Sequence, residues 1–125
     1  MALANALKLC RDLQRGDVSA MEVMQQTYAR IGDINPQVNA IVNLLEPEAA
    51  MILAQAADAV PIAERGPLHG LPIATKDAVD VSGFPTTKGF APWANKIARK
   101  DDAQAARLRN AGAVFIGHTN MPEFG

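Results

Sequence analysis

The fold is decided between residues 71 and 116, where two strand-like runs enclose a helical segment. The first run reads LPIATKDAV (residues 71–79), and the second reads AVFI (113–116). Between them, Asp101 or Asp102 can cap a helix at its start, and Gly112 can close it. A strand, a crossover helix and a second strand predict a right-handed βαβ unit, and therefore an α/β fold.

The residues before this unit predict a mainly helical region. Leu3, Ala6, Leu7 and Cys10 have the helical spacing i, i+3, i+4, i+7, which predicts an amphipathic helix over residues 3–14 that stops before Gly16. A second helix is expected at residues 20–32, because Ser19 and Glu22 match a capping box.

Two proline positions set the elements that follow. The pair Asn35-Pro36 is expected to break the second helix, since the residue before a proline avoids the helical region. A short strand is predicted over residues 38–45, and Pro47 can open a third helix that runs to Val60. At the other end of the chain, residues 118–125 are expected to form a loop.

Composition excludes several classes of function. The 125 residues suit one domain, and 12 basic against 13 acidic residues give a formal net charge of −1. Without a basic stripe we expect no nucleic-acid partner, and without a run of about 20 apolar residues we expect no membrane partner. The single cysteine, Cys10, permits no internal disulfide and indicates a cytoplasmic protein.

Lys76 is the residue whose pattern points most directly to chemistry. Because side chains alternate along a strand, Lys76 would share a face with Ala74 and Ala78, two small residues that offer no counter-charge. Burial without a partner disfavours the charged amine, and a lysine in that state can act as a general base. We therefore predict that Lys76 is shielded on a strand. The pattern alone also fits a solvated strand lysine beside Asp77.

The serines predict little nucleophilic chemistry within these residues. Only Ser19 and Ser82 are present, and Ser19 is assigned to a helix cap. Ser82 follows Lys76 by six residues but lacks the G-x-S-x-G context of a nucleophile. A Ser82–Lys76 dyad is kept as an alternative.

The histidines and threonines fit structural roles. His69 and His118 have no cysteine or glutamate at metal-ligand spacing, so we expect turn or capping histidines and no metal. Thr86 and Thr87 fit turn chemistry, although such a pair can also line a site. No glycine-rich phosphate loop is present, and we expect no cofactor.

Several stretches in register resemble the amidase-signature family. They are GPLHGLPIATKD (66–77), GFPTT (83–87), ARLRNAGAVFIG (106–117) and TNMPEFG (119–125), together with Asn35-Pro36 and VNA (38–40) in the leader. These motifs keep the family's order and spacing over nearly the whole chain. Two residues depart from the pattern: His118 stands where a lysine is common, and Phe90 is bulkier than the small residue often found near there.

The resemblance implies a fold and a catalytic residue. The fold would be the N-terminal part of the amidase-signature fold, a mixed β-sheet flanked by helices and incomplete here. Residues 1–125 would be a fragment of a single amidase domain, with a mainly helical leader (1–65) and the start of the catalytic α/β core (66–125). Lys76 matches the family's catalytic lysine, which takes a proton from a serine held by a cis peptide. That serine activates a nucleophilic serine, and both would lie beyond Gly125.

The resemblance implies cleavage of the C–N bond of a small-molecule amide, with the acyl group passed to water by a hydrolase or to another acceptor by an amidotransferase. A chain with only Lys76 of the relay is expected to be inactive by itself. Two alternatives stay open: a non-catalytic α/β remnant or association module, and a lyase in which Lys76 forms a Schiff base. Because an incomplete sheet exposes strand edges and apolar faces, we also expect self-association, as a homodimer.

Overall fold

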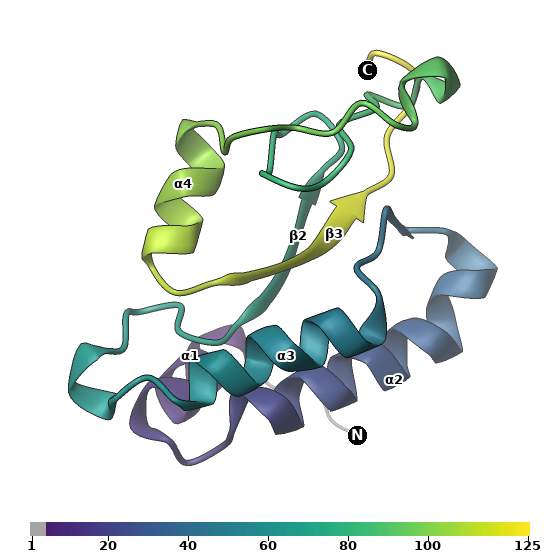
Figure 1. Ribbon diagram of the computed structural model, residues 1–125. Helices are drawn as coiled ribbons and strands as arrows, with labels where there is room; N and C mark the ends of the chain where they lie inside the picture. The colour runs from purple at the N-terminus through teal and green to yellow at the C-terminus, as the bar shows by residue number, and fades with distance from the viewer. Residues whose placement is uncertain (1–4) are drawn as a thin grey trace.

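The computed structural model describes residues 5–125 and has a mixed α/β architecture, so the predicted fold class is confirmed (Figure 1). The first half contains α1 (Ala6–Arg15), α2 (Ala20–Val38), β1 (Ile41–Val42), α3 (Pro47–Asp58) and the 3₁₀ turn η1 (Ile62–Glu64). The second half contains β2 (Pro72–Lys76), the 3₁₀ turn η2 (Ala91–Trp93), α4 (Ala103–Asn110) and β3 (Val114–Thr119). Within the described residues, no helix is long and apolar enough to cross a bilayer.

The three strands form one sheet in the order β1-β3-β2. β2 and β3 are parallel and pair from Pro72–Val114 to Lys76–Thr119, with α4 in the connection between them. β1 pairs antiparallel with the end of β3. Among residues 5–125, β2 has a neighbour on one side only, so its outer edge is open.

Helices cover both faces of the sheet. In Figure 1, α1, α2 and α3 lie on one face and α4 lies on the other. Two apolar clusters match these layers. The larger one joins Ile116 of β3 to buried residues of the first three helices: Leu13, Ala20, Val23, Met24, Ala50 and Ala54. The smaller one joins Phe115 of β3 to Ala105 of α4 and to Val81.

The leader helices differ from the predicted pattern in two places. Leu3 lies outside the described residues, and Leu7 is 59% exposed, whereas Leu9 and Leu13, one helical turn apart, face the core. The prediction that Asn35-Pro36 breaks α2 is wrong, because the helix runs through Pro36 to Val38. Its end is held by the Asn35 side chain, which accepts from the Ile41 N–H (2.8 Å) and donates to the Ile41 carbonyl (3.0 Å).

The strands also differ in length from the predictions. The strand expected over residues 38–45 shrinks to the two residues of β1, since Val38 is still helical and Asn43 has a positive φ of 52°. β2 ends at Lys76 rather than near Val79. β3 continues to Thr119, so His118 lies in a strand and not in the expected loop.

Candidate active site

Lys76 is the last residue of β2, which confirms its predicted place on a strand. The prediction that Lys76 is shielded is wrong, because its side chain is exposed. Ala78, expected on the same strand face, lies in a turn in which the N–H groups of Ala78 and Val79 both donate to the Lys76 carbonyl, at 2.7 and 3.0 Å. Among the described residues, no ion pair involves the Lys76 ammonium.

Asp77 is buried directly behind Lys76, with 2% of its surface exposed. One carboxylate oxygen accepts from the Thr87 N–H at 2.9 Å, and the other accepts from the Thr87 hydroxyl. Sequence reasoning treated Asp77 only as a neighbour of Lys76. The alternation of strand side chains was the available signal, because a residue after an outward lysine points inward and must then find donors.

His118 is fully buried and faces the same cluster. Its Nε2 lies 3.0 Å from the Val79 carbonyl, and its Nδ1 lies 3.4 Å from a carboxylate oxygen of Asp77. The expectation of a turn or capping histidine is wrong for His118, and a register shift explains why. Ile73 pairs with Phe115 and Ala74 with Gly117, so Ile116 is an extra residue on β3. Such a bulge reverses the alternation beyond it and turns His118 toward Asp77.

A hollow of about 250 Å³ lies beside this cluster. Its lining includes the polar residues Asn43, Asp77, Thr87 and Asn120, and Gly89, Ala91 and Ala94 form part of its wall. Thr87 therefore lines a site as well as making a turn contact, whereas Lys76 is not among the lining residues. The arrangement places a small hollow, lined by both polar and apolar residues, at the same edge of the sheet as an exposed lysine.

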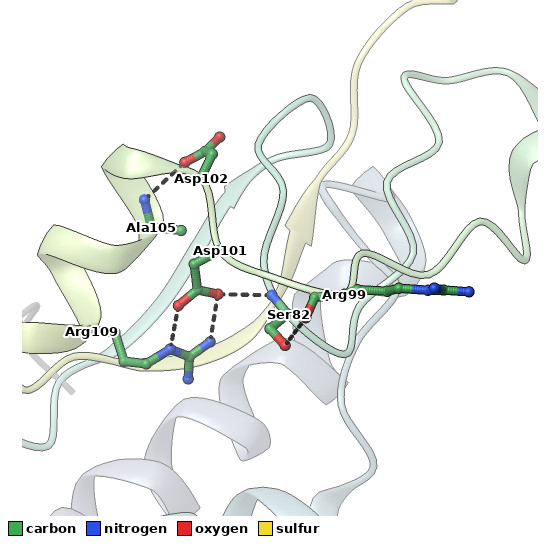
Figure 2. A network of polar contacts seen from close by, with 6 residues as sticks. All are labelled: Ser82, Arg99, Asp101, Asp102, Ala105 and Arg109. Atoms are coloured by element: carbon green, nitrogen blue, oxygen red, sulfur yellow. Dashed lines mark hydrogen bonds and ion pairs between the residues drawn. The ribbon is translucent and has the colours of Figure 1, made fainter.

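The two serines are both engaged elsewhere. Ser19 caps α2 as predicted, accepting from the Glu22 N–H at 3.0 Å. The Ser82 hydroxyl donates to the Arg99 carbonyl at 3.3 Å, and its N–H donates to Asp101 (Figure 2). Because these contacts join Ser82 to residues 99–101, the structure does not bring Ser82 and Lys76 together in a hydrogen bond.

His69 lies in a turn, as predicted, and is 4% exposed. Burial lowers the pKa of its imidazole below the ordinary 6.5, and the charge of Arg65 lowers it further. A backbone hydrogen bond with Ala57 and the Asp58 carboxylate oppose this shift. Within residues 5–125, no three His, Cys, Asp or Glu side chains are grouped as metal ligands.

Comparison with known proteins gives this site a family context. The chain is 34% identical over 122 residues to an acylamidase of Rhodococcus erythropolis, covering 97% of this chain and 26% of that protein. It is 40% identical over 124 residues to a glutamyl-tRNA(Gln) amidotransferase subunit of Rhodopirellula baltica, covering 98% of this chain and 25% of that protein. The chain therefore spans about a quarter of the length of these relatives.

Solved structures of amidases resemble this chain in fold as well as in sequence. The peptide amidase of Stenotrophomonas maltophilia superposes with a TM-score of 0.84 at 28% identity, over 98% of this chain and 26% of that one. The sequence model of the Amidase family matches residues 22–125, which include both strands of the parallel pair and the whole Asp77 cluster. The chain thus belongs to the amidase family and corresponds to the N-terminal portion of its relatives.

Proposed function

We propose that this chain is the N-terminal section of an amide hydrolase in which Lys76 is the base of a serine–serine–lysine relay. In that proposal, residues 1–65 form a leader and residues 66–125 begin the catalytic core of one amidase domain. The observation that carries it is the position of Lys76 at the end of β2, next to Asp77, which lines the small hollow. Lys76 is exposed there and forms no ion pair within residues 5–125. A base must reach its proton donor, and an exposed strand end allows a further segment to approach.

Lys76 alone would supply little catalysis. A general base contributes about 10²–10⁴-fold, and only when a nucleophile is in place to be activated. The relay serines and the oxyanion donors are assigned to a region that these 125 residues do not contain. We therefore expect the purified 125-residue chain to hydrolyse no amide at an appreciable rate.

A chimera tests the role of Lys76. Residues 1–125 would replace the matched quarter of the Rhodococcus acylamidase, and hydrolysis of that enzyme's own amide substrate would be measured. Lys76→Ala should lower kcat by about 10²–10⁴-fold, since the base is lost. Lys76→Arg should fare no better, because a guanidinium stays protonated.

Ser82→Ala is the matched control in the same chimera, and it should leave kcat unchanged because the Ser82 hydroxyl is bonded to the Arg99 carbonyl. A Lys76→Ala chimera with full activity would refute the proposed role of Lys76. Strong turnover by the isolated chain, abolished by Ser82→Ala, would instead establish the Ser82–Lys76 dyad.

A second, non-catalytic property is favoured by the open side of the sheet. The free edge of β2 borders a hollow of about 470 Å³ whose apolar lining includes Ile31, Ile34, Val38, Pro72, Ala74 and Ile116. Unpaired strand edges and apolar surfaces both promote association, and we propose that two copies of the chain cover this side mutually.

Analytical ultracentrifugation over a range of concentrations tests this self-association. Ile34→Glu, within the hollow, should shift the chain toward monomer. Ile52→Glu is the control, because Ile52 is 66% exposed on α3 and does not line that hollow. A constant monomer mass at all concentrations would contradict the proposal.

A further inference from the structure

We infer that Asp77 is a positioning residue for Lys76: it fixes the direction in which the lysine leaves the sheet. This inference rests on the proposed role of Lys76 as the relay base. Asp77 does not act by touching the amine, because within residues 5–125 no ion pair joins Asp77 to Lys76. It acts through the backbone that the two residues share.

Asp77 ties three separate segments together at the end of β2. Its N–H donates to the Thr119 carbonyl of β3 at 3.1 Å, and its own carbonyl accepts from the Lys88 N–H at 2.9 Å. Its carboxylate accepts both the N–H and the hydroxyl of Thr87. One buried residue thus joins β2, β3 and the loop at residues 87–88.

The turn after Lys76 is fixed from its other side by His118. The Lys76 carbonyl accepts two N–H groups, from Ala78 and Val79, and the Val79 carbonyl in turn lies 3.0 Å from His118 Nε2. Phe84 packs against the imidazole with ring centroids 6.0 Å apart. Lys76 is therefore followed by the Asp77–Thr119 hydrogen bond between strands and by a hydrogen-bonded turn. Both restrict the backbone from which the Lys76 side chain extends.

The burial of a carboxylate at this point argues for a specific role. An apolar side chain would fill the same space without the desolvation cost of a carboxylate, but it would gather no donors. Asp77 collects a hydroxyl and a backbone N–H from the neighbouring loop, and these bonds set distances and angles that apolar packing leaves freer. General-base catalysis depends on such geometry, and a misplacement of about 1 Å can cost about 100-fold in rate.

Hydrogen exchange on the 125-residue chain tests directly whether the Asp77–Thr87 hydrogen bonds restrict the backbone around Lys76. Thr87→Val keeps the shape of the side chain and removes the hydroxyl donor, whereas Thr87→Ser keeps the donor. The valine variant should speed exchange of the Val79 and Lys88 amides by about tenfold or more, and the serine variant should not. Unchanged exchange in Thr87→Val and in Asp77→Asn would overturn the inference.

The catalytic consequence is measured in the acylamidase chimera. Asp77→Asn should lower kcat by about 100-fold with KM within about threefold, and Thr87→Val should lower kcat by about tenfold, with recovery in Thr87→Ser. Asp101→Asn is the matched control. Asp101 also holds the segment between β2 and α4 (residues 77–102), but it lies at the end away from Asp77, where it accepts hydrogen bonds from Ser82 and Arg109 (Figure 2). It should leave kcat within about twofold.

The outcomes separate this inference from the proposed function. If Lys76→Ala abolishes turnover while Asp77→Asn keeps full kcat, the relay role stands and the positioning role fails. A loss confined to KM, or an equal kcat loss in Asp101→Asn, also overturns the positioning role. If Lys76→Ala retains full turnover, the proposed function itself fails, and the positioning role fails with it.

Discussion

The leader helices and the connection at residues 77–102 are stabilised in different ways. α1, α2 and α3 bury a continuous apolar cluster against Ile116. The connection contains only the three-residue turn η2 and one isolated bridge, Pro85–Ile97, and is held at its two ends by the carboxylates of Asp77 and Asp101. Apolar burial therefore fixes where the helices lie, whereas the connection combines these polar acceptors with the burial of Val81 against Ala105 and Phe115.

The two carboxylates of the connection are themselves unequal. Asp77 is buried, and its donors are neutral groups of Thr87. Asp101 lies nearer the surface, and its hydrogen bond to the Arg109 guanidinium holds the pKa of the Asp101 carboxyl below its ordinary value. Because Arg109 is 45% exposed, this ion pair is screened by solvent and contributes little to stability. The buried end is thus the more restrictive of the two.

The largest effect is expected from a cavity in the leader. Met24 is fully buried in the apolar cluster, so Met24→Ala should lower the free energy of unfolding by about 2–5 kcal/mol. Leu7→Ala is the control, because Leu7 is 59% exposed, and it should change the free energy of unfolding by less than about 0.5 kcal/mol. Urea denaturation measures both. Equal losses would show that the leader is not held by this cluster.

The sequence predicted best those parts that apolar burial determines. The helical spacing of apolar residues over 3–14 predicted α1, and the apolar run AVFI predicted the core of β3, where Phe115 and Ile116 are buried. These patterns need no knowledge of neighbours, because an apolar stripe must be buried somewhere.

Features set by long-range pairing were not predictable in this way. The bulge at Ile116 depends on the register between β2 and β3, and it reverses the orientation of His118. The helix continues past Pro36 to Val38, and its end is joined to β1 by the hydrogen bonds of the Asn35 side chain to Ile41, six residues on. For the candidate site, the motif predicts Lys76 as the base, but the exposure of Lys76 and the Asp77 cluster behind it depend on contacts with Thr87 and β3.

An intermediate effect is expected from a carboxylate inside the leader. It tests whether polar contacts stabilise the leader helices as well as the connection at residues 77–102. Asp58 accepts from the N–H groups of Ala20 and Met21, at 2.7 and 3.0 Å, at the start of α2. Asp58→Ala should therefore cost about 1–2 kcal/mol, as the loss of a helix cap does.

The control for Asp58→Ala is Asp17→Ala, since the side chain of Asp17 is exposed and makes no hydrogen bond among the described residues. Thermal unfolding would measure both variants. If Asp58→Ala were as mild as Asp17→Ala, polar caps would matter only in the connection at residues 77–102, and the contrast between the two regions would be sharper than we describe.

The smallest effect is expected from protonation of His69, which packs where the leader meets the sheet. The backbone of His69 lies against Gly112, whose φ is 101° and where an added Cβ would come within 2.7 Å of the His69 Cα. Burial and the Arg65 charge lower the pKa of His69 in the folded state, so the unfolded chain binds a proton more readily. The contribution of His69 to stability is then complete above about pH 6.5 and is lost as the pH falls below that value.

Urea denaturation between about pH 7.5 and 5.5 measures this effect, and over that range the unmodified chain should lose more stability than His69→Gln. A loss of the same size in His69→Gln would show that another group carries the pH dependence and that the junction is insensitive to the charge of His69.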